Sequence, residues 1–140
     1  MARTMREINV AMAFLCQIDR YHFQLRTGPE TIGAVGLIGC FGGRINSRET
    51  ADEAVSREVA EETNISAMPD SFHFLGSVNV VSDRDQEDVA IRAKVFKILL
   101  PLQAHVVARQ GALVTLHANE LIPQIDKFTP ATRAAIEELL

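Results

Sequence analysis

The sequence is poor in aromatic residues and cysteine: its 140 residues include no tryptophan, one tyrosine and two cysteines. Cys16 and Cys40 each stand alone in an apolar run, without the spacing of a metal-binding motif or of a disulfide framework. A disulfide-stapled secreted domain is therefore excluded. We expect two buried, reduced thiols and a cytoplasmic protein.

Long hydrophobic runs are also lacking. The most apolar stretch, residues 32–43, is short and interrupted by glycines, whereas a membrane-spanning helix needs about 18 consecutive apolar residues. The run at residues 8–18 follows two arginines, but Glu7, Asn9 and Gln17 make it a better strand than a signal peptide. We expect no membrane partner.

Positive charge is scarce as well, because the chain carries a net charge of -4 and has a pI near 5.5. A broad cationic surface for duplex nucleic acid is therefore disfavoured, although a local basic pocket is compatible with this composition. With 47% hydrophobic residues, the chain can bury one core. We expect a single domain over residues 1–140.

Apolar runs bounded by turn residues predict a sheet of short strands. Residues 8–18 and 22–27 should form a hairpin that turns at Asp19 and Arg20. A short strand at residues 35–41 should end in a Gly42–Gly43 turn. Further strands are expected at residues 72–81, 88–100 and 110–117, the first two as an antiparallel pair.

Two helices follow from their capping residues. Thr50 and Glu53 fit a capping box, which predicts a helix from Ala51, and Asn64 should end it in the left-handed conformation that asparagine tolerates. Thr129 before Pro130 marks a C-terminal helix. Strands and helices in this order predict an α+β fold, with a mixed sheet packed between helices.

The first helix carries three glutamates on one face. At 100° per residue, Glu58, Glu61 and Glu62 share the side of the apolar residues that should face the core, although like charges at this spacing repel. Three partly desolvated carboxylates suit a hard divalent cation such as Mg²⁺ or Mn²⁺. The alternative is a salt-bridged structural face, in which Arg57 forms an ordinary surface ion pair.

The spacing around these glutamates resembles a known sequence motif. Gly43, five residues, Glu49, seven residues and then residues 57–65 (REVAEETNI) are similar to the Nudix box, G-x5-E-x7-R-E-aliphatic-x-E-E-x-G-aliphatic. Every charged position matches. The one departure is Asn64, where the family has glycine, and the motif covers residues 43–65.

The resemblance to the Nudix family implies an α/β/α sandwich and a hydrolase that cleaves a diphosphate linkage in a nucleoside diphosphate derivative. Glu58, Glu61 and Glu62 would bind Mg²⁺ and supply the base, and Arg57 would orient them. The Gly42 carbonyl would be a further metal ligand, and Glu49 would support the loop or a second metal. Bases outside the motif would come from Glu87, Asp88 or Glu120, although each of these can equally be a solvated side chain.

The substrate is less defined than the reaction. The sequence lacks the signatures of ADP-ribose, dinucleoside polyphosphate, NADH and coenzyme A subfamilies, which leaves a nucleoside triphosphate or a modified nucleotide as the favoured class. Arg26 and Arg44 could bind phosphate, or be plain surface charges. Phe41 could stack a base, although phenylalanine more often belongs to the core.

Two readings other than an enzyme are open. One is a non-catalytic nucleotide-binding regulatory module on a Nudix scaffold, which the complete set of motif carboxylates disfavours. The other is a protein-interaction domain with a structural acidic helix. A homodimer is compatible with each reading.

Overall fold

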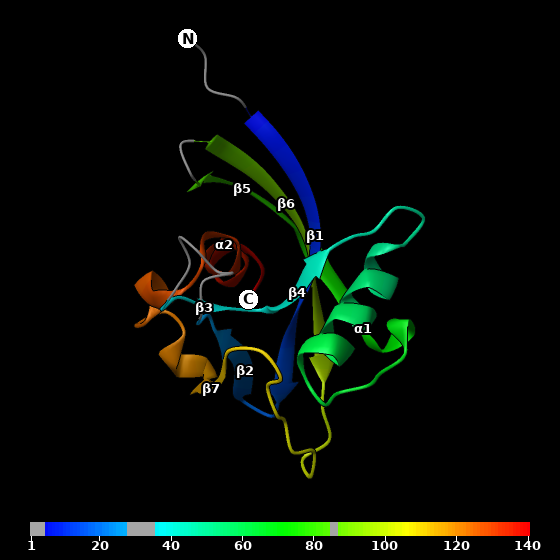
Figure 1. The fold of residues 1–140 in the computed structure, drawn as a ribbon. Coiled ribbons are helices and arrows are strands. Elements are labelled where there is room, and N and C mark those ends of the chain that lie inside the picture. Colours follow the sequence, from blue (N-terminus) through cyan, green and yellow to red (C-terminus); the bar gives the residue numbers. More distant parts are fainter. Residues whose placement is uncertain (1–4, 28–35, 85–86) are drawn as a thin grey trace.

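The computed structural model describes residues 5–27, 36–84 and 87–140, and it shows a mixed sheet between two helices (Figure 1). No helix in these ranges has the length and apolar character needed to cross a membrane. The strands are β1 (Met5–Gln17), β2 (Arg20–Leu25), β3 (Ile38–Gly39), β4 (Phe41–Arg44), β5 (His73–Arg84), β6 (Glu87–Leu99) and β7 (Ala112–His117). The helices are α1 (Ala51–Glu62) and α2 (Pro130–Leu139), with short 3-10 turns η2 (Pro69–Ser71), η3 (Ala118–Glu120) and η4 (Ile125–Lys127).

The sheet is built around β1. Its strand order is β3-β2-β1-β6-β5, and β7 pairs with the outer edge of β2. β6 runs parallel to β1 along almost its whole length. Along its other edge, β1 pairs first with β4 and then with β2, both antiparallel. Gly42 and Gly43 of β4 are thus held directly against the central strand.

Alternation along β1 separates two hydrophobic cores. Met12, Phe14 and Cys16 belong to the core beneath α2, whereas Ala11 and Ala13 belong to the core beneath α1. The small alanine side chains leave room for the fully buried residues of α1 to approach the sheet. The helices therefore cover opposite faces of the sheet, as the expected α/β/α sandwich requires.

The predicted strand pairs are confirmed, but two turns differ from the prediction. The β1–β2 hairpin turns at Ile18 and Asp19, with Ile18 at φ 54°, one residue before the predicted turn. The Gly42–Gly43 turn was predicted wrongly, because both glycines lie inside β4 and pair with β1. Val35, which began the predicted third strand, lies outside the described residues.

Candidate active site

Helix α1 begins where its capping box places it. The Thr50 hydroxyl accepts the backbone N–H of Glu53, and the Glu53 carboxylate accepts the N–H of Thr50 at 2.9 Å. Ala54, Val55 and Val59 face the core and are fully buried. This combination of capping and burial fixes the rotation of α1, and thereby the direction in which its glutamates point.

Arg57 connects the helix to the loop that precedes it. Its Nε and Nη2 donate to the two carboxylate oxygens of Glu49 at 2.8 and 2.9 Å, and Nη2 also donates to the carbonyl of Arg44 at 3.1 Å. Nη1 donates to Glu58 at 2.8 Å and to Glu61 at 3.3 Å. The hydrogen bonds from Arg57 lower the pKa of Glu49 to about 2, which keeps the Glu49 carboxylate ionised.

Glu62 is the site carboxylate that lies deepest, with 9% of its surface exposed. One carboxylate oxygen accepts the backbone N–H of Gly42 at 2.8 Å. Burial raises the pKa of Glu62 to about 7, and the charges of Glu58 and Glu61 act in the same direction. The Gly42 N–H and the positive charge of Arg26 oppose this rise but do not cancel it.

Glu58 lies directly over the backbone of Gly43. A Cβ atom on Gly43 would come within 2.6 Å of a Glu58 carboxylate oxygen, which is well inside van der Waals contact. A Cβ on Gly42 would collide with the backbone of Ala11 and Met12. Both glycines are thus required by close approach, one to the central strand and one to a site carboxylate.

A pocket of about 320 Å³ opens beside these glycines. Gly42, Gly43, Arg26 and Arg44 are among its lining residues. The other lining residues are mostly aliphatic, and they are Ile8, Val10, Met12, Leu37, Cys40, Ser82, Ile91 and the first residues of α2 with Thr129. The pocket therefore combines two arginines and two glycines with a largely apolar wall.

Arg26 reaches the pocket from the end of β2. A Cβ atom on Gly39 would lie 3.3 Å from its Nε, so the guanidinium packs beside β3. Arg44 is exposed at the pocket and holds Arg57 through its carbonyl. The structure thus places both predicted phosphate-binding arginines on the lining of one pocket.

The prediction that Phe41 stacks a base was wrong. Its side chain is fully buried in the core beneath α1, so no part of the ring is available to a ligand. Phe23 is fully buried in the other core, where it packs edge-on to Phe128 at 5.1 Å. Alternation within β4 explains the position of Phe41, because its neighbour Gly42 lines the pocket instead.

Asn64 ends the helix differently from the prediction. Thr63 is the C-cap, with extended backbone at φ -137° and ψ 178°, and the positive φ values of non-glycine residues in the described ranges fall at Ile18 and Arg48 rather than Asn64. The Asn64 amide instead bonds to the backbone of His105 and Val107. The left-handed explanation for Asn64 is therefore wrong.

Three residues outside the motif, Glu87, Asp88 and Glu120, were predicted as alternative bases. Glu120 is engaged at the start of η3, where its carboxylate accepts the N–H of His117 at 2.8 Å. Asp88 lies at the start of β6, opposite Met5 of β1. The side chain of Glu87 lies outside the described part of the structure. None of these observations gives any of the three a role in the site.

Within the described ranges, no three acidic, histidine or cysteine side chains are gathered closely enough to hold a metal ion as they stand. Arg57 explains this, because its Nη1 occupies the carboxylates of Glu58 and Glu61. The site nevertheless fits a divalent cation. Glu62 is a buried carboxylate with too little compensating charge, and Gly43 leaves open the space in which the Glu58 carboxylate lies.

Comparison with known families decides the identity of this arrangement. The family model of the NUDIX domain matches residues 14–130, which include both helices' capping segments and the whole motif. The chain belongs to the Nudix family. A comparison with the curated proteins found no relative of significant similarity.

Solved structures share this Nudix fold over nearly the whole chain. The MutT NUDIX hydrolase from Burkholderia pseudomallei is 22% identical with a TM-score of 0.71, covering 96% of this chain and 99% of its own. The MutT protein from Methanosarcina mazei Go1 is 23% identical with a TM-score of 0.72, at 94% and 91% coverage. The E. coli dihydroneopterin triphosphate pyrophosphohydrolase is 18% identical with a TM-score of 0.73, at 97% coverage of both chains.

Sequence reasoning missed the residues that build the wall of the pocket in this Nudix domain. Ile8, Val10 and Met12 share one face of β1 by simple alternation, and that periodicity was available in the sequence. The contribution of α2 and its cap was not, because residues 129–132 meet β1 only through the tertiary fold. Motif matching found the carboxylates, but apart from Gly43 and Arg44 the pocket is lined by residues outside the motif.

Proposed function

We propose that this Nudix hydrolase cleaves a diphosphate linkage in a nucleoside diphosphate derivative, with a nucleoside triphosphate or a modified nucleotide as the favoured class, in the presence of Mg²⁺ or Mn²⁺. The observation that carries the proposal is the position of the buried Glu62 carboxylate, which bonds to Gly42 on the lining of a pocket that also contains Arg26 and Arg44. This contact supports the proposal because it links a carboxylate proposed for the cation to a pocket whose lining includes the two arginines proposed for phosphate.

Each residue has a role in this proposal. Glu58, Glu61 and Glu62, with the Gly42 carbonyl, would hold the cation, and one of the three carboxylates would accept the proton of the attacking water. A bound Mg²⁺ lowers the pKa of water and neutralises phosphate charge. Arg57 orients Glu58 and Glu61, and Glu49 fixes Arg57.

Arg26 and Arg44 bind the phosphates in this proposal, because a guanidinium matches phosphate oxygens with paired donors. The organic part of the substrate then packs against the aliphatic side chains that β1, β6 and the start of α2 contribute to the pocket. Hydrolysis adds one water across the phosphorus–oxygen–phosphorus bridge and yields two phosphate products. The pocket volume of about 320 Å³ supports a substrate whose organic group is roughly of nucleobase size.

Other expectations remain proposals. The two unpaired, buried cysteines support a reducing, cytoplasmic location. We also propose that residues 1–140 act as one domain on small molecules and not on duplex nucleic acid. A homodimer stays compatible with the fold, and light scattering of the purified protein measures it.

A substrate panel tests the proposal. Nucleoside triphosphates with unmodified and oxidised bases, ADP-ribose, nucleotide sugars and dinucleoside polyphosphates are incubated with Mg²⁺ or with chelator, and phosphate and nucleoside monophosphate release are measured. We expect metal-dependent turnover of one class, and a loss of at least about a hundredfold in Glu61→Gln and Glu62→Gln. Full turnover by both variants would refute the proposal, and ligand binding without turnover would favour the regulatory module.

A further inference from the structure

The last turn of α1 carries Glu61 and Glu62, yet it contains no basic residue of its own. A helix leaves its last four carbonyls without intrahelical partners, and the negative end of its dipole lies there. Val59 is satisfied locally, since its carbonyl accepts both the N–H and the hydroxyl of Thr63. The carbonyls of Ala60 and Glu62 are satisfied from another part of the chain.

That other part is the segment at residues 105–109, between β6 and β7, which we call the 105–109 segment. The Asn64 amide donates to the His105 carbonyl at 2.6 Å and accepts the Val107 N–H at 2.8 Å. The Asn64 N–H donates to the Val107 carbonyl at 3.2 Å. Asn64 thus makes three hydrogen bonds to the 105–109 segment, two of them through the side chain that replaces the family's glycine.

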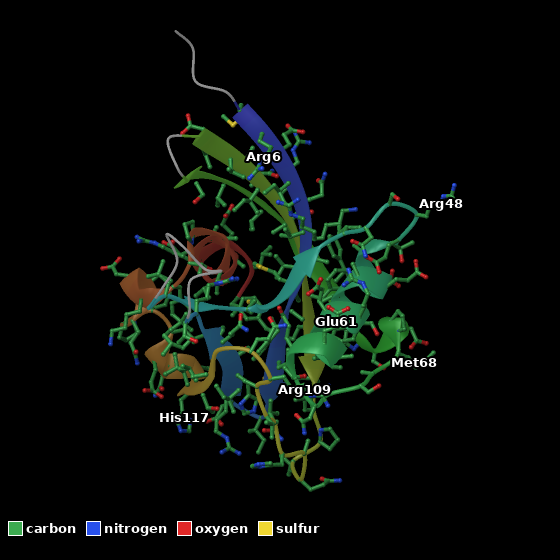
Figure 2. The ribbon with its side chains drawn as sticks, viewed as in Figure 1. Arg6, Arg48, Glu61, Met68, Arg109 and His117 are labelled. Carbon is green, nitrogen blue, oxygen red and sulfur yellow. The ribbon has the colours of Figure 1, made fainter. Side chains whose placement is uncertain are left out.

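Arg109 completes the attachment. Because the Asn64 N–H is directed to Val107, the Ala60 carbonyl is open, and Arg109 Nη1 donates to it at 3.0 Å. The backbone N–H of Arg109 donates to the Glu62 carbonyl at 2.7 Å. Figure 2 shows Arg109 just beyond the end of the helix that carries Glu61. One residue therefore caps two carbonyls and places a positive charge at the negative end of the dipole.

We propose that Arg109 and Asn64 are positioning residues of the active site, which hold the last turn of α1 so that Glu61 and Glu62 face the cation and the substrate. The inference rests on the proposed function, because it assigns these residues to the same site. Neither residue lines the pocket. Both act through the backbone of the turn, whose displacement by even 1 Å is enough to misalign the carboxylates.

Three variants and one control test this inference. Asn64→Gly installs the residue of the family motif and removes both side-chain bonds. Arg109→Ala removes the guanidinium but keeps the backbone bond to Glu62, and Arg109→Lys keeps the charge. Arg92→Ala is the matched control, because Arg92 is an exposed arginine paired with Glu7 on the other end of the sheet. The readouts are kcat, KM, melting temperature and calorimetric Mn²⁺ affinity of the substrate-free protein.

We expect Arg109→Ala and Asn64→Gly each to lower kcat about tenfold or more and to weaken Mn²⁺ binding severalfold, with KM changed less than about threefold. Arg109→Lys should recover most of the Mn²⁺ affinity, since its charge still opposes the helix dipole. A purely structural role would lower the melting temperature alone. Equal kcat and Mn²⁺ affinity in Arg109→Ala, Asn64→Gly and Arg92→Ala would overturn the inference.

Failure of the proposed function is distinguishable from failure of this inference. A wild-type protein that hydrolyses none of the panel substrates contradicts the proposed function. The Mn²⁺ titration still decides the positioning role in that case, because it needs no substrate. Weaker Mn²⁺ binding in Arg109→Ala than in Arg92→Ala supports the inference, and equal binding refutes it.

Discussion

At the scale of single residues, Glu62 shows the conflict between stability and function most clearly. Its carboxylate is buried and accepts one hydrogen bond from Gly42, and its neighbours Glu58 and Glu61 add negative charge. Without a cation, ionising such a group costs free energy of folding. The buried site carboxylate therefore lowers the folding stability of the metal-free protein.

Replacing Glu62 with glutamine should stabilise the metal-free protein at alkaline pH. The pKa of Glu62 is about 7 in the fold and near 4.5 in the unfolded chain, so the wild type loses stability as the pH rises through this window. Glutamine keeps an oxygen for Gly42 and removes the charge. We expect a gain of up to about 3 kcal/mol in free energy of unfolding at pH 8.5.

Denaturant unfolding in chelator measures this difference, and at pH 4.5 it should vanish. Glu62→Gln should at the same time abolish hydrolysis. A variant that is less stable than wild type at pH 8.5 would contradict the account of Glu62 as an uncompensated buried anion.

Gly43 makes a second prediction at this scale. A methyl group there collides with the Glu58 carboxylate, so Gly43→Ala should cost about 1–3 kcal/mol of stability and most of the turnover. A double-mutant cycle isolates the cause, because Glu58→Ala removes the colliding group. Gly43→Ala should then cost little more in that background. An unchanged cost would show that the glycine is needed for another reason.

At the scale of elements, the start of α1 was predictable from the sequence and its end was not. Thr50 and Glu53 find each other three residues apart, so a local pattern describes them. Asn64 finds its partners at His105 and Val107, more than forty residues away, and no local rule describes that choice. The motif predicted that the helix stops here, but the mechanism of stopping is tertiary.

Removal of the capping hydroxyl should weaken α1 without disturbing its chemistry. Thr50→Ala loses the acceptor for the Glu53 N–H, and we expect a loss of about 1 kcal/mol in the free energy of unfolding. Ser47→Ala, in the same loop and exposed, is the matched control. Urea unfolding of both variants checks the difference, and equal stability of the two would contradict the role of the cap.

At the scale of the whole molecule, the layer architecture and the set of carboxylates were predictable from the sequence. Of the pocket, only part of the lining was predictable. Hydrophobic alternation gave the strand pairs, and the spacing of the motif gave the acidic face. Gly42 and Gly43 were misplaced in a turn, because glycine pairs usually mark turns. The close approach of Ala11 and Met12 explains Gly42 within the strand and that of Glu58 explains Gly43, and both contacts belong to the folded chain.

The pH dependence of folding stability should reflect two buried groups, His22 and Glu62, whose effects have opposite signs. The His22 ring is buried between Gln17 and Thr115, at 2.7 and 2.8 Å. The Gln17 amide nitrogen donates to two backbone carbonyls, so its oxygen accepts from His22 Nε2, and in a neutral ring Nδ1 then accepts from the Thr115 hydroxyl. A neutral His22 thus satisfies both ring nitrogens. Burial, aided by the charge of Arg20, lowers the pKa of His22 below 6.5.

Below pH 6.5 the unfolded chain therefore binds a proton at His22 that the folded protein does not, and stability falls as the pH falls. Glu62 has the opposite slope between pH 4.5 and 7. In chelator, between pH 4.5 and 6.5, we expect stability to rise with pH for Glu62→Gln, to fall with pH for His22→Gln, and to have an intermediate slope for wild type. Parallel slopes for the two variants would contradict this assignment.

The pairing of β1 with β6 has a consequence for how the chain is made. Met5 is opposite Asp88, and the parallel register continues to Cys16 and Leu99, so every contact in it joins residues 83 positions apart. Such pairing is slow to form, because a long loop must close first. On the ribosome, β1 can form its hairpin with β2 early, but its other edge cannot pair until β6 has been synthesised. During synthesis that edge is open to strands of other nascent chains.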